Sequence, residues 1–332
     1  MRKLFFGRLK YDPVDPLIRC GDAAVSVLAG RDLLGLPMKV ELLAELPAPL
    51  RIVAKQLSDG SWEYPGANLK IRTQSNYNQL ETYRNLGILV EEFALDKKHP
   101  AIRRAADYLF SFQTATGDFR GIYGNQYSPN YSAGIMELLI KAGYGSDRRI
   151  MKAFRWLLSI RQQDGGWAIP FRTKGYGVKV IYKRTGVIEP DTTKVFSGMV
   201  TGVVLRAFAA HPQFRKHKAA ISAGRLLLSS LFTKDNYPDR AGKASWERFN
   251  FPFWYTDVIS ALDTLSQLGF SSREPQVEKG LSWLAGRQRQ NGRWTLKLLK
   301  GRNKDKLQLY LALAICRIFK RFKSEKRGGA NN

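Results

Sequence analysis

The sequence has few cysteines, few histidines and no long apolar run, and each shortage excludes a class of protein. Its two cysteines, Cys20 and Cys316, stand far apart without a partner motif, which excludes a disulfide framework and a multi-cysteine zinc site. The longest apolar run without a charge, residues 195–205, contains two glycines and is far shorter than the roughly 18 residues that cross a bilayer. The sequence therefore predicts no membrane-spanning helix.

An export signal is also missing from the first ten residues. Arg8 and Lys10 interrupt the apolar residues there before the core of a signal peptide can form. Together with the scarce cysteines, this favours a reducing compartment. We expect a cytoplasmic protein, either free or peripheral on the inner face of the membrane, and its 44% of apolar residues supply material for a sizeable core.

Acidic residues are scarce relative to basic ones. The 54 lysines and arginines outnumber 28 acidic residues and give a formal net charge of +26, which favours contact with an anionic partner. Residues 297–327 alone carry eleven basic and two acidic side chains, so this basic tail is either a solvated helix face or a binding surface. Phospholipid headgroups and diphosphate substrates are the expected partners; nucleic acid is not, because no known nucleic-acid-binding module accompanies the charge.

A short pattern recurs along the chain: glutamine, three residues, glycine, one residue and an aromatic side chain. The complete copies are residues 56–62, 113–119 and 288–294. A fourth copy, residues 161–167, has arginine in the glutamine position and glutamine beside it. The long gap before the last copy predicts a decayed copy near residues 234–237, after a helical run at 217–232.

The copies separate two kinds of predicted helix. Each follows an amphipathic helix, such as residues 103–110 or 279–284, with charge on one face and apolar bulk on the other. The helices that alternate with these amphipathic helices are more apolar on all sides, and they are predicted at residues 77–93, 129–142, 197–210, 253–268 and 307–319. With a further pair at 19–34 and 41–57, the sequence predicts five outer and six inner helices and no competing strand pattern. The predicted fold class is all-α, built of helical hairpins.

The turn pattern has a structural explanation. Its glycine allows a positive backbone dihedral where the chain reverses. Its glutamine amide both donates and accepts hydrogen bonds, so it can reach backbone groups left unpaired at adjoining helix ends, while the aromatic side chain covers the junction. Six inner helices are enough for the hairpins to close into a ring.

The repeat resembles that of the class II terpene cyclases and the protein prenyltransferase β subunits, in which Gln-x-x-x-Gly-x-Trp follows a Lys/Arg-Gly/Ala-x-x-aromatic-Leu run. The pattern is complete at residues 279–294, and residues 104–119 differ only in the final aromatic. Over roughly residues 40–320 the chain is similar to a prenyltransferase and squalene-oxidase repeat protein. The resemblance implies an α/α toroid, an (α/α)5–6 barrel whose inner helices point their N-termini at an apolar central cavity.

This resemblance suggests a division of the chain into an N-terminal segment at residues 1–18, a single toroid domain at 19–323 and a disordered tail at 324–332. A long connection at residues 168–196 interrupts the domain and carries six basic and two acidic residues. It is either a lid or clamp for an anionic group, or a plain basic surface loop. Alternating side chains at residues 178–183 predict a short hairpin, ended by residues 185–186.

Motifs of other branches of this superfamily are missing. Zinc prenyltransferases bind their metal through Asp, Cys and His, but neither cysteine here has an aspartate two residues before it, and His99, His211 and His217 lie near outer-helix starts. The thioester Cys-Gly-Glu-Gln of complement-like toroids and the paired Cys and His of lanthionine cyclases are absent too. We expect no metal and no cofactor.

The Asp-x-Asp-Asp acid motif of terpene cyclases is also absent from the sequence. Its chemistry needs a carboxylic acid that is held protonated in a dry cavity, where it can protonate an alkene or an epoxide. In one alignment Asp191 takes the acid position and Thr193 follows it. In a competing alignment, which the apolar helix favours, residues 200–205 start the helix and Met199 takes the acid position.

Residues at the N-terminal ends of the inner helices are the best candidates for a site, because unpaired amides and the helix dipole attract anions there. Three strings rich in aromatic and polar residues fall at such ends, at 77–83, 125–131 and 246–257. Their aromatic rings offer π faces to a carbocation or an apolar chain. The proposed substrate-binding residues are Tyr77, Asn130, Tyr131, Trp254 and Tyr255.

Three carboxylates are candidate catalytic acids, Asp257 first and then Asp191 and Glu81. Asp257 lies in the most concentrated aromatic and acidic segment and, with Glu81, would supply or relay a proton. The alternative is structural: aromatic side chains at helix junctions belong to the core, and Asp257 caps a helix or pairs with a nearby arginine. Glu81, Glu137 and Asp263 would then face solvent or form salt bridges.

These observations favour a terpenoid cyclase-like protein that binds an isoprenoid or another long apolar molecule in a central cavity. If it is an enzyme, the resemblance implies acid-initiated cyclisation by a class II terpene cyclase-like isomerase or lyase. One alternative is a non-catalytic toroid that serves as a scaffold for a partner or for an anionic membrane surface. Another is an (α/α) barrel enzyme that acts on acidic polysaccharide, with Glu81 and Asp257 as paired carboxylates. The sequence carries no signal for the oligomeric state.

Overall fold

The computed structural model describes residues 7–182, 184–299 and 304–324. The chain forms two compact units, which we name by their place in the sequence. The central unit comprises residues 41–223, and the terminal unit combines residues 1–40 with residues 224–332. Residues 325–332, within the predicted tail, lie outside the described residues.

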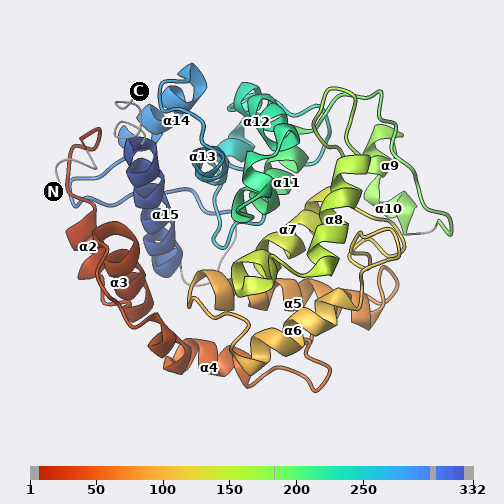
Figure 1. The fold of residues 1–332 in the computed structure, drawn as a ribbon, viewed down its shortest axis with the longest axis horizontal. Helices are drawn as coiled ribbons and strands as arrows, with labels where there is room; N and C mark the ends of the chain where they lie inside the picture. The colour runs from red at the N-terminus through yellow and green to blue at the C-terminus, as the bar shows by residue number, and fades with distance from the viewer. Residues whose placement is uncertain (1–6, 183, 300–303, 325–332) are drawn as a thin grey trace. The chain divides into compact units, whose positions relative to one another are not determined.

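The described residues of the central unit are helical, as the sequence predicted (Figure 1). Its α-helices are α4 (Pro47–Val53), α5 (Gln74–Glu91), α6 (Pro100–Phe110), α7 (Pro129–Leu139), α8 (Arg148–Ser159), α9 (Pro170–Thr173), α10 (Val178–Ile181) and α11 (Gly198–Ala210). A π-helical turn, η3 (Ile140–Tyr144), extends α7, and a 3₁₀ turn, η4 (Phe214–Lys216), follows α11. Helix α12 (Lys218–Ser230) and the 3₁₀ turn η2 (Val40–Glu45) contain residues of both units.

The terminal unit is helical too. It contains α2 (Val14–Ile18), α3 (Ala23–Ala29), η1 (Gly30–Leu34), η5 (Lys243–Glu247), α13 (Val258–Gln267), α14 (Pro275–Ala285) and α15 (Lys304–Ser324). Helix α15 packs on α13 and also contacts α2, α3 and η1 (Figure 1). The described residues of both units contain isolated β-bridges but no strand. Within the same ranges, no helix combines the length and the hydropathy needed to cross a bilayer.

Amphipathic and fully buried helices alternate in the central unit, which confirms the predicted hairpin pattern. The buried residues of α8 are Ile150, Ala153, Phe154, Trp156 and Leu157. In α11, by contrast, every residue except Ala210 is buried, and α7 packs against it (Figure 1). The side chains of Asp147 and Ser197 cap the starts of α8 and α11, because each accepts a hydrogen bond from a backbone N–H of the first turn.

A buried ion cluster joins the C-terminal halves of α5, α7 and α11. The Glu137 carboxylate on α7 accepts hydrogen bonds from Nε of Arg206 on α11 and from Nζ of Lys141, at 2.8 Å in both cases. Lys141 also pairs with Glu91 at the end of α5. Burial would raise the pKa of Glu137, but the charges of Arg206 and Lys141 outweigh it and lower the pKa. Glu137 therefore forms the salt bridges that the structural alternative predicted.

The glutamine turns have the hydrogen bonds that their sequence predicts. Gln56 Nε2 donates to the carbonyl of Gly60 inside its own turn (2.9 Å) and to that of Ala101 in the first turn of α6 (2.8 Å). The buried Trp62 covers the junction, and its Nε1 donates to the carbonyl of Ile52 in α4 (2.7 Å). The other two complete copies repeat the paired amide bonds. One amide thus joins each turn to the segment that packs beside it.

Glycine is required in these turns for two reasons. The φ angle is 88° at Gly60 and 77° at Gly292, in the left-handed region that disfavours other residues. A Cβ atom would also lie 2.3 Å from the carbonyl oxygen of Arg104 at Gly60, and 2.1 Å from that of Asp12 at Gly292. The turn therefore approaches its neighbouring backbone more closely than any side chain allows.

The copy with arginine divides the two bonds of the glutamine between neighbouring residues. Arg161 donates from Nε and Nη2 to the carbonyl of Gly165, at 2.9 and 2.7 Å, which replaces the bond inside the turn. Gln162 Nε2 donates to the carbonyls of Asp191 and Lys194, at 2.8 Å each. This copy therefore holds the end of the long connection rather than the start of a helix.

The predicted hairpin at residues 178–183 is wrong. Residues 178–181 form the single helical turn α10, in which Ile181 is fully buried. The alternation over residues 178–183 fits one turn of helix with a buried side as well as it fits a strand, so the pattern was too short to decide. The helical run expected at residues 217–232 is confirmed by α12. Beyond it, the buried Trp246 donates from Nε1 to the carbonyl of Thr233 (2.8 Å), beside the predicted decayed copy.

Candidate functional site

The predicted site residues fall in both units, so each group is described by itself. Those of the central unit are Tyr77, Glu81, Asn130, Tyr131 and Asp191. Those of the terminal unit are Trp254, Tyr255 and Asp257, of which Trp254 and Tyr255 are partly exposed.

In the central unit an arginine lies between two tyrosine rings at the start of α5. The guanidinium carbon of Arg72 is 5.3 Å from the centre of the Tyr77 ring and 5.2 Å from that of the Tyr182 ring. Arg72 also donates to the hydroxyl of Tyr182, which donates to the carbonyl of Ile122 (3.3 Å). Burial raises the pKa of the Tyr182 hydroxyl although Arg72 opposes the shift, so this group is neutral at physiological pH.

Tyr123 extends this group toward α7. The centre of its ring lies 5.2 Å from that of Tyr131 and 5.4 Å from that of Phe171, edge to face in both cases, and 6.4 Å from that of Tyr182. The rings of Tyr123, Tyr131 and Tyr182 are partly exposed, whereas Phe171 is buried. We call the following residues the tyrosine cluster: Arg72, Tyr77, Tyr123, Tyr131 and Tyr182.

The long connection is hydrogen-bonded to the residues that precede α7. Asn125 Nδ2 donates to the carbonyl of Thr185 (2.6 Å), and Gln126 Nε2 donates to that of Gly186 (2.8 Å). Gln126 Oε1 in turn accepts a hydrogen bond from the backbone N–H of Ile188 (2.9 Å). These bonds hold the connection, which carries Tyr182, against the start of α7.

The tyrosine cluster carries a fixed positive charge. Among the described residues, no carboxylate forms an ion pair with Arg72, and its buried Nε has no hydrogen-bond partner. The dipoles of α5 and α7 add partial positive charge at the N-terminal ends of these helices. The cluster therefore favours an anionic group flanked by apolar or aromatic surface. It disfavours a carbocation, because the π faces of Tyr77 and Tyr182 already face a guanidinium.

The structure brings together only some of the residues predicted in this unit. Tyr77 and Tyr131 belong to one cluster, whereas Asn130 lies beside it and its side-chain oxygen accepts a hydrogen bond from the Ser128 hydroxyl. Sequence reasoning missed Arg72, Tyr123 and Tyr182 as site residues. Tyr123 stands two residues before a string that was singled out, which was a usable signal, but nothing in the sequence distinguishes Arg72 from the other arginines.

Two of the three candidate acids are engaged by neighbouring groups. Glu81 pairs with Arg84, one helical turn away on α5 (3.3 Å). The carboxylate of Asp191 accepts hydrogen bonds from the hydroxyl and the backbone N–H of Thr193, at 2.6 and 3.2 Å, and Lys174 Nζ lies 3.7 Å away. The Thr193 hydroxyl is the main cause that lowers the pKa of Asp191. A lowered pKa keeps this carboxyl ionised at neutral pH, which is the opposite of what a proton donor needs.

Of the two alignments of the missing acid motif, the one that places a helix at residues 200–205 agrees with the position of the helix in the structure. Helix α11 begins at Gly198 and includes residues 200–205. This alignment places Met199 where terpene cyclases have their acid, so neither alignment supplies a proton donor from this part of the chain.

In the terminal unit the third candidate acid, Asp257, caps a helix. The side chain is fully buried, and its Oδ1 accepts a hydrogen bond from the backbone N–H of Ser260 (2.9 Å). Ser260 Oγ accepts one from the backbone N–H of Asp257 (2.9 Å), which completes a capping box. This box begins α13 at Val258, later than the predicted start at residue 253. The structural alternative for Asp257 therefore describes its hydrogen bonds.

A second arginine–tyrosine pair lies near Asp257. The guanidinium carbon of Arg240 is 4.5 Å from the centre of the Tyr255 ring, and Nη2 donates to the carbonyls of Ser245 and Arg248, at 3.3 and 3.5 Å. Burial lowers the pKa of Arg240, while the nearby Tyr255 and Asp257 oppose the shift. This arginine therefore has a carboxylate and two carbonyls around it, unlike Arg72.

Two cavities of the terminal unit lie at opposite ends of α15. The larger, of about 690 Å³, is near the helix start, where Trp294 and Leu296 line it and Gln308 exchanges two hydrogen bonds with the backbone of Leu296 (2.8 and 3.0 Å). Its polar groups are therefore partly used within the protein. Within the described ranges, no three histidine, cysteine or acidic side chains gather where they could hold a metal ion.

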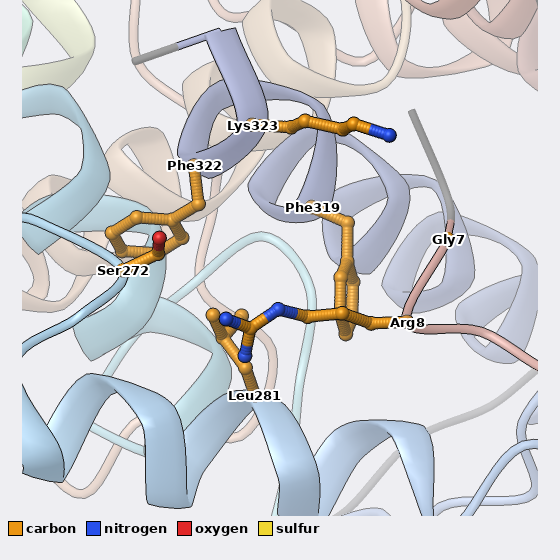
Figure 2. A pocket seen from close by; sticks show the side chains of 7 residues that line it. All are labelled: Gly7, Arg8, Ser272, Leu281, Phe319, Phe322 and Lys323. Carbon is orange, nitrogen blue, oxygen red and sulfur yellow. The ribbon is translucent and has the colours of Figure 1, made fainter. Parts of the chain in front are cut away.

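The smaller cavity, of about 270 Å³, lies near the end of α15. Figure 2 shows the side chain of Arg8 extending across Phe319 toward Leu281. Arg8 pairs with Glu278 and is the main cause that lowers the pKa of this carboxyl. Of the two cations that line this cavity, Arg8 and Lys323, Arg8 is therefore already neutralised by a carboxylate.

The sequence matches the family of the squalene-hopene cyclase C-terminal domain over residues 81–173. The matched region runs from α5 into α9 and contains the turns at residues 113–119 and 161–167. It confirms the resemblance to the terpenoid cyclase and prenyltransferase superfamily and, with the alternating helices, the α/α toroid fold class. Closure of the hairpins into a ring stays a prediction. No curated protein matches the sequence.

Several solved structures are similar to this chain at low sequence identity. A polysaccharide lyase is 12% identical with a TM-score of 0.45, and the comparison covers 88% of each chain. The type II terpene cyclase MstE from Scytonema is 14% identical with a TM-score of 0.38, over 85% of this chain and 98% of that one. A variant of MstE in complex with geranylgeranyl dihydroxybenzoate is 13% identical with a TM-score of 0.38, over 86% of this chain and 98% of that one.

Proposed function

We propose that this chain binds an isoprenoid, or a similar long apolar molecule, that ends in an anionic group. The observation that carries the proposal is the guanidinium of Arg72 between the rings of Tyr77 and Tyr182. The guanidinium offers a fixed charge and directed N–H donors to a diphosphate or carboxylate. The tyrosine rings offer apolar faces to the first isoprene units.

Binding without acid-initiated cyclisation fits the candidate acids best. Glu81 is paired with Arg84, Asp191 has a lowered pKa, and Asp257 caps α13. A class II cyclase needs a carboxylic acid that is protonated and free to give its proton to the substrate. The proposed function is therefore that of a non-catalytic protein that binds the predicted isoprenoid. The acidic-polysaccharide alternative relied on Glu81 and Asp257, and their hydrogen bonds and ion pairs do not favour it.

A binding experiment tests the anionic group of the ligand. Calorimetric titration with geranylgeranyl diphosphate and with the uncharged alcohol geranylgeraniol should show that the diphosphate binds about tenfold more tightly or better. Replacing Arg72 by glutamine should lower the affinity for the diphosphate about tenfold and leave that for the alcohol unchanged. The matched control is Arg155→Gln, which removes an exposed arginine from α8. Equal affinity for both ligands, or an equal loss in the control variant, would overturn the proposal.

A second experiment tests whether turnover occurs. The purified protein is incubated with squalene, oxidosqualene and geranylgeranyl diphosphate, and the extracts are analysed by mass spectrometry. We expect no cyclised product, because the described candidate acids are paired, ionised or engaged in a cap. A product that forms with the wild type and disappears with Asp257→Asn would instead identify the chain as a cyclase that uses this acid.

A further inference from the structure

Two loops of the central unit carry exposed apolar side chains. In the loop before α5, Leu69 is 65% exposed and Ile71 is 45% exposed, and Val180 on α10 is 44% exposed. Single apolar side chains at a surface are ordinary, but a group of them at neighbouring loop tips marks a place where the protein meets another apolar phase.

The tyrosine cluster joins these two loops side by side. Arg72 follows Ile71 directly and donates to the hydroxyl of Tyr182, which stands two residues after Val180. The ring of Tyr77 also contacts Arg72, and its hydroxyl donates to the carbonyl of residue 68 in the first loop (3.2 Å). Each of the three exposed apolar residues therefore lies within three positions of one of the two residues that form the contact between Arg72 and Tyr182.

The same area carries unneutralised positive charge. Lys70, Lys179 and Arg184 are exposed, and among the described residues none of them forms an ion pair. The carboxylate of Glu189, on the same connection, accepts a hydrogen bond from the hydroxyl of Tyr127 (2.6 Å). The loop tips thus combine exposed apolar side chains with cations close to them in the sequence.

We propose that these two loops form a docking surface for an anionic lipid bilayer. A bilayer interface accepts leucine, isoleucine and valine side chains among its acyl chains, while its phosphates attract cations that lie just beside them. A nucleic acid would use the cations but would leave the apolar side chains in water. Docking here would place the tyrosine cluster next to lipid, where an isoprenoid with an anionic end resides. The proposal goes beyond isoprenoid binding, since docking needs no isoprenoid.

Vesicle co-sedimentation of the full chain tests the docking surface. We expect binding to vesicles in which about one lipid in three is phosphatidylglycerol, and about tenfold weaker binding to vesicles of phosphatidylcholine alone. The combined variant Leu69→Ser, Ile71→Ser and Val180→Ser should lose about tenfold or more of its vesicle binding. Failure of the wild type to bind either vesicle would overturn the proposal.

A matched variant controls for the removal of apolar surface. Leu42, Leu50 and Leu57 lie in the same unit and are 48%, 51% and 41% exposed. Replacing these three by serine should leave vesicle binding unchanged, and circular dichroism should show that both triple variants keep their helices. An equal loss of vesicle binding in both variants would mean that the loops have no special role, and would refute the proposal.

A charge variant separates lipid from other anionic partners. We expect Lys70→Gln with Lys179→Gln to weaken binding to phosphatidylglycerol vesicles and to reduce its salt dependence. Binding of single-stranded RNA that is weakened by this charge variant but unaffected by the serine variant would indicate a nucleic-acid surface and overturn the proposal.

Titration with geranylgeranyl diphosphate distinguishes this proposal from the proposed function. The serine variant at residues 69, 71 and 180 should bind the diphosphate as the wild type does, because it leaves the tyrosine cluster intact. Loss of vesicle binding with diphosphate binding retained supports docking by itself. If the serine variant loses diphosphate binding as well, the loops belong to the isoprenoid site and a separate docking surface is refuted.

Discussion

The two ends of α5, α7 and α11 differ in how positive charge is neutralised. At their C-terminal halves, Arg206 and Lys141 bind the carboxylate of Glu137, so opposite charges meet inside the protein. Near the N-terminal ends of α5 and α7, Arg72 meets tyrosine rings and, among the described residues, no carboxylate. The first arrangement stabilises the packing of helices, whereas the second leaves a charge for the ligand that we propose. The comparison therefore separates a structural cluster from the proposed binding site by how their charges are neutralised.

The largest effect on stability is expected at the ion cluster. Replacing Glu137 by glutamine leaves Arg206 buried without its anion, so we expect the free energy of unfolding to fall by about 3–5 kcal/mol. Urea denaturation measures this loss. The control is Glu81→Gln, which breaks the more exposed pair with Arg84 and should cost less than about 1 kcal/mol. Similar losses in the two variants would contradict the structural role of the cluster.

The pH dependence of stability sharpens the same contrast. Glu137 has a folded-state pKa below its ordinary value of 4.5, so its contribution to stability is present above that pH and is lost as the pH falls through the folded pKa. In thermal unfolding scans, the wild type should therefore lose more stability below about pH 4.5 than Glu137→Gln does. Parallel curves for the two proteins would show that Glu137 does not carry this dependence.

An intermediate effect on the free energy of unfolding is expected at the cap of α13. Asp257 accepts the capping bond from Ser260, so Asp257→Ala should lower the free energy of unfolding by about 1–2 kcal/mol. Asparagine caps helices as well as aspartate, so Asp257→Asn should cost less than about half of that. Chemical denaturation of both variants measures the difference. A loss as large for asparagine as for alanine would show that the negative charge beside Arg240 matters more than the cap.

The smallest effect on stability is expected at Arg72, near the N-terminal ends of α5 and α7. Arg72 has no carboxylate to leave unpaired, so Arg72→Lys and Arg72→Gln should each change the free energy of unfolding by less than about 1 kcal/mol. Lysine keeps the charge but not the planar group between the rings, so Arg72→Lys should bind geranylgeranyl diphosphate more weakly than the wild type and more tightly than Arg72→Gln. If the glutamine variant instead unfolds as easily as Glu137→Gln, Arg72 is structural.

The repeated turns show how far local patterns carry a prediction. The glutamine, glycine and aromatic positions each had a predicted role, and the hydrogen bonds of Gln56, the positive φ of Gly60 and the burial of Trp62 confirm the three roles. Such roles depend on residues within one turn and on the backbone beside it, and the three complete copies fulfil them in the same way. The division of the two bonds between Arg161 and Gln162 was not predictable, because the partner of Gln162 belongs to the connection that follows.

The wrong prediction at residues 178–183 and the cap formed by Asp257 each have a physical reason. The hairpin expected at residues 178–183 rested on an alternation too short to separate a strand from a helical turn, and the burial of Ile181 fits the turn. Asp257 was placed among the candidate acids because of its aromatic surroundings, while the short hydrogen-bonded loop with Ser260 explains it as a cap. For Asp257 the sequence offered the structural interpretation but no means to choose it, whereas for residues 178–183 it did not offer the helical turn.

The amino-acid sequence by itself determined the alternation of amphipathic and buried helices and the chemistry of the turns between them, because periodicity and turn geometry depend on residues close together in the chain. Only the tertiary structure decided which charges meet. Glu137 and Arg206 are 69 positions apart, and Arg72 and Tyr182 are 110 positions apart. No local pattern encodes such pairs, so the distinction between an arginine that holds helices together and one that we propose binds a ligand emerges only when the chain has folded.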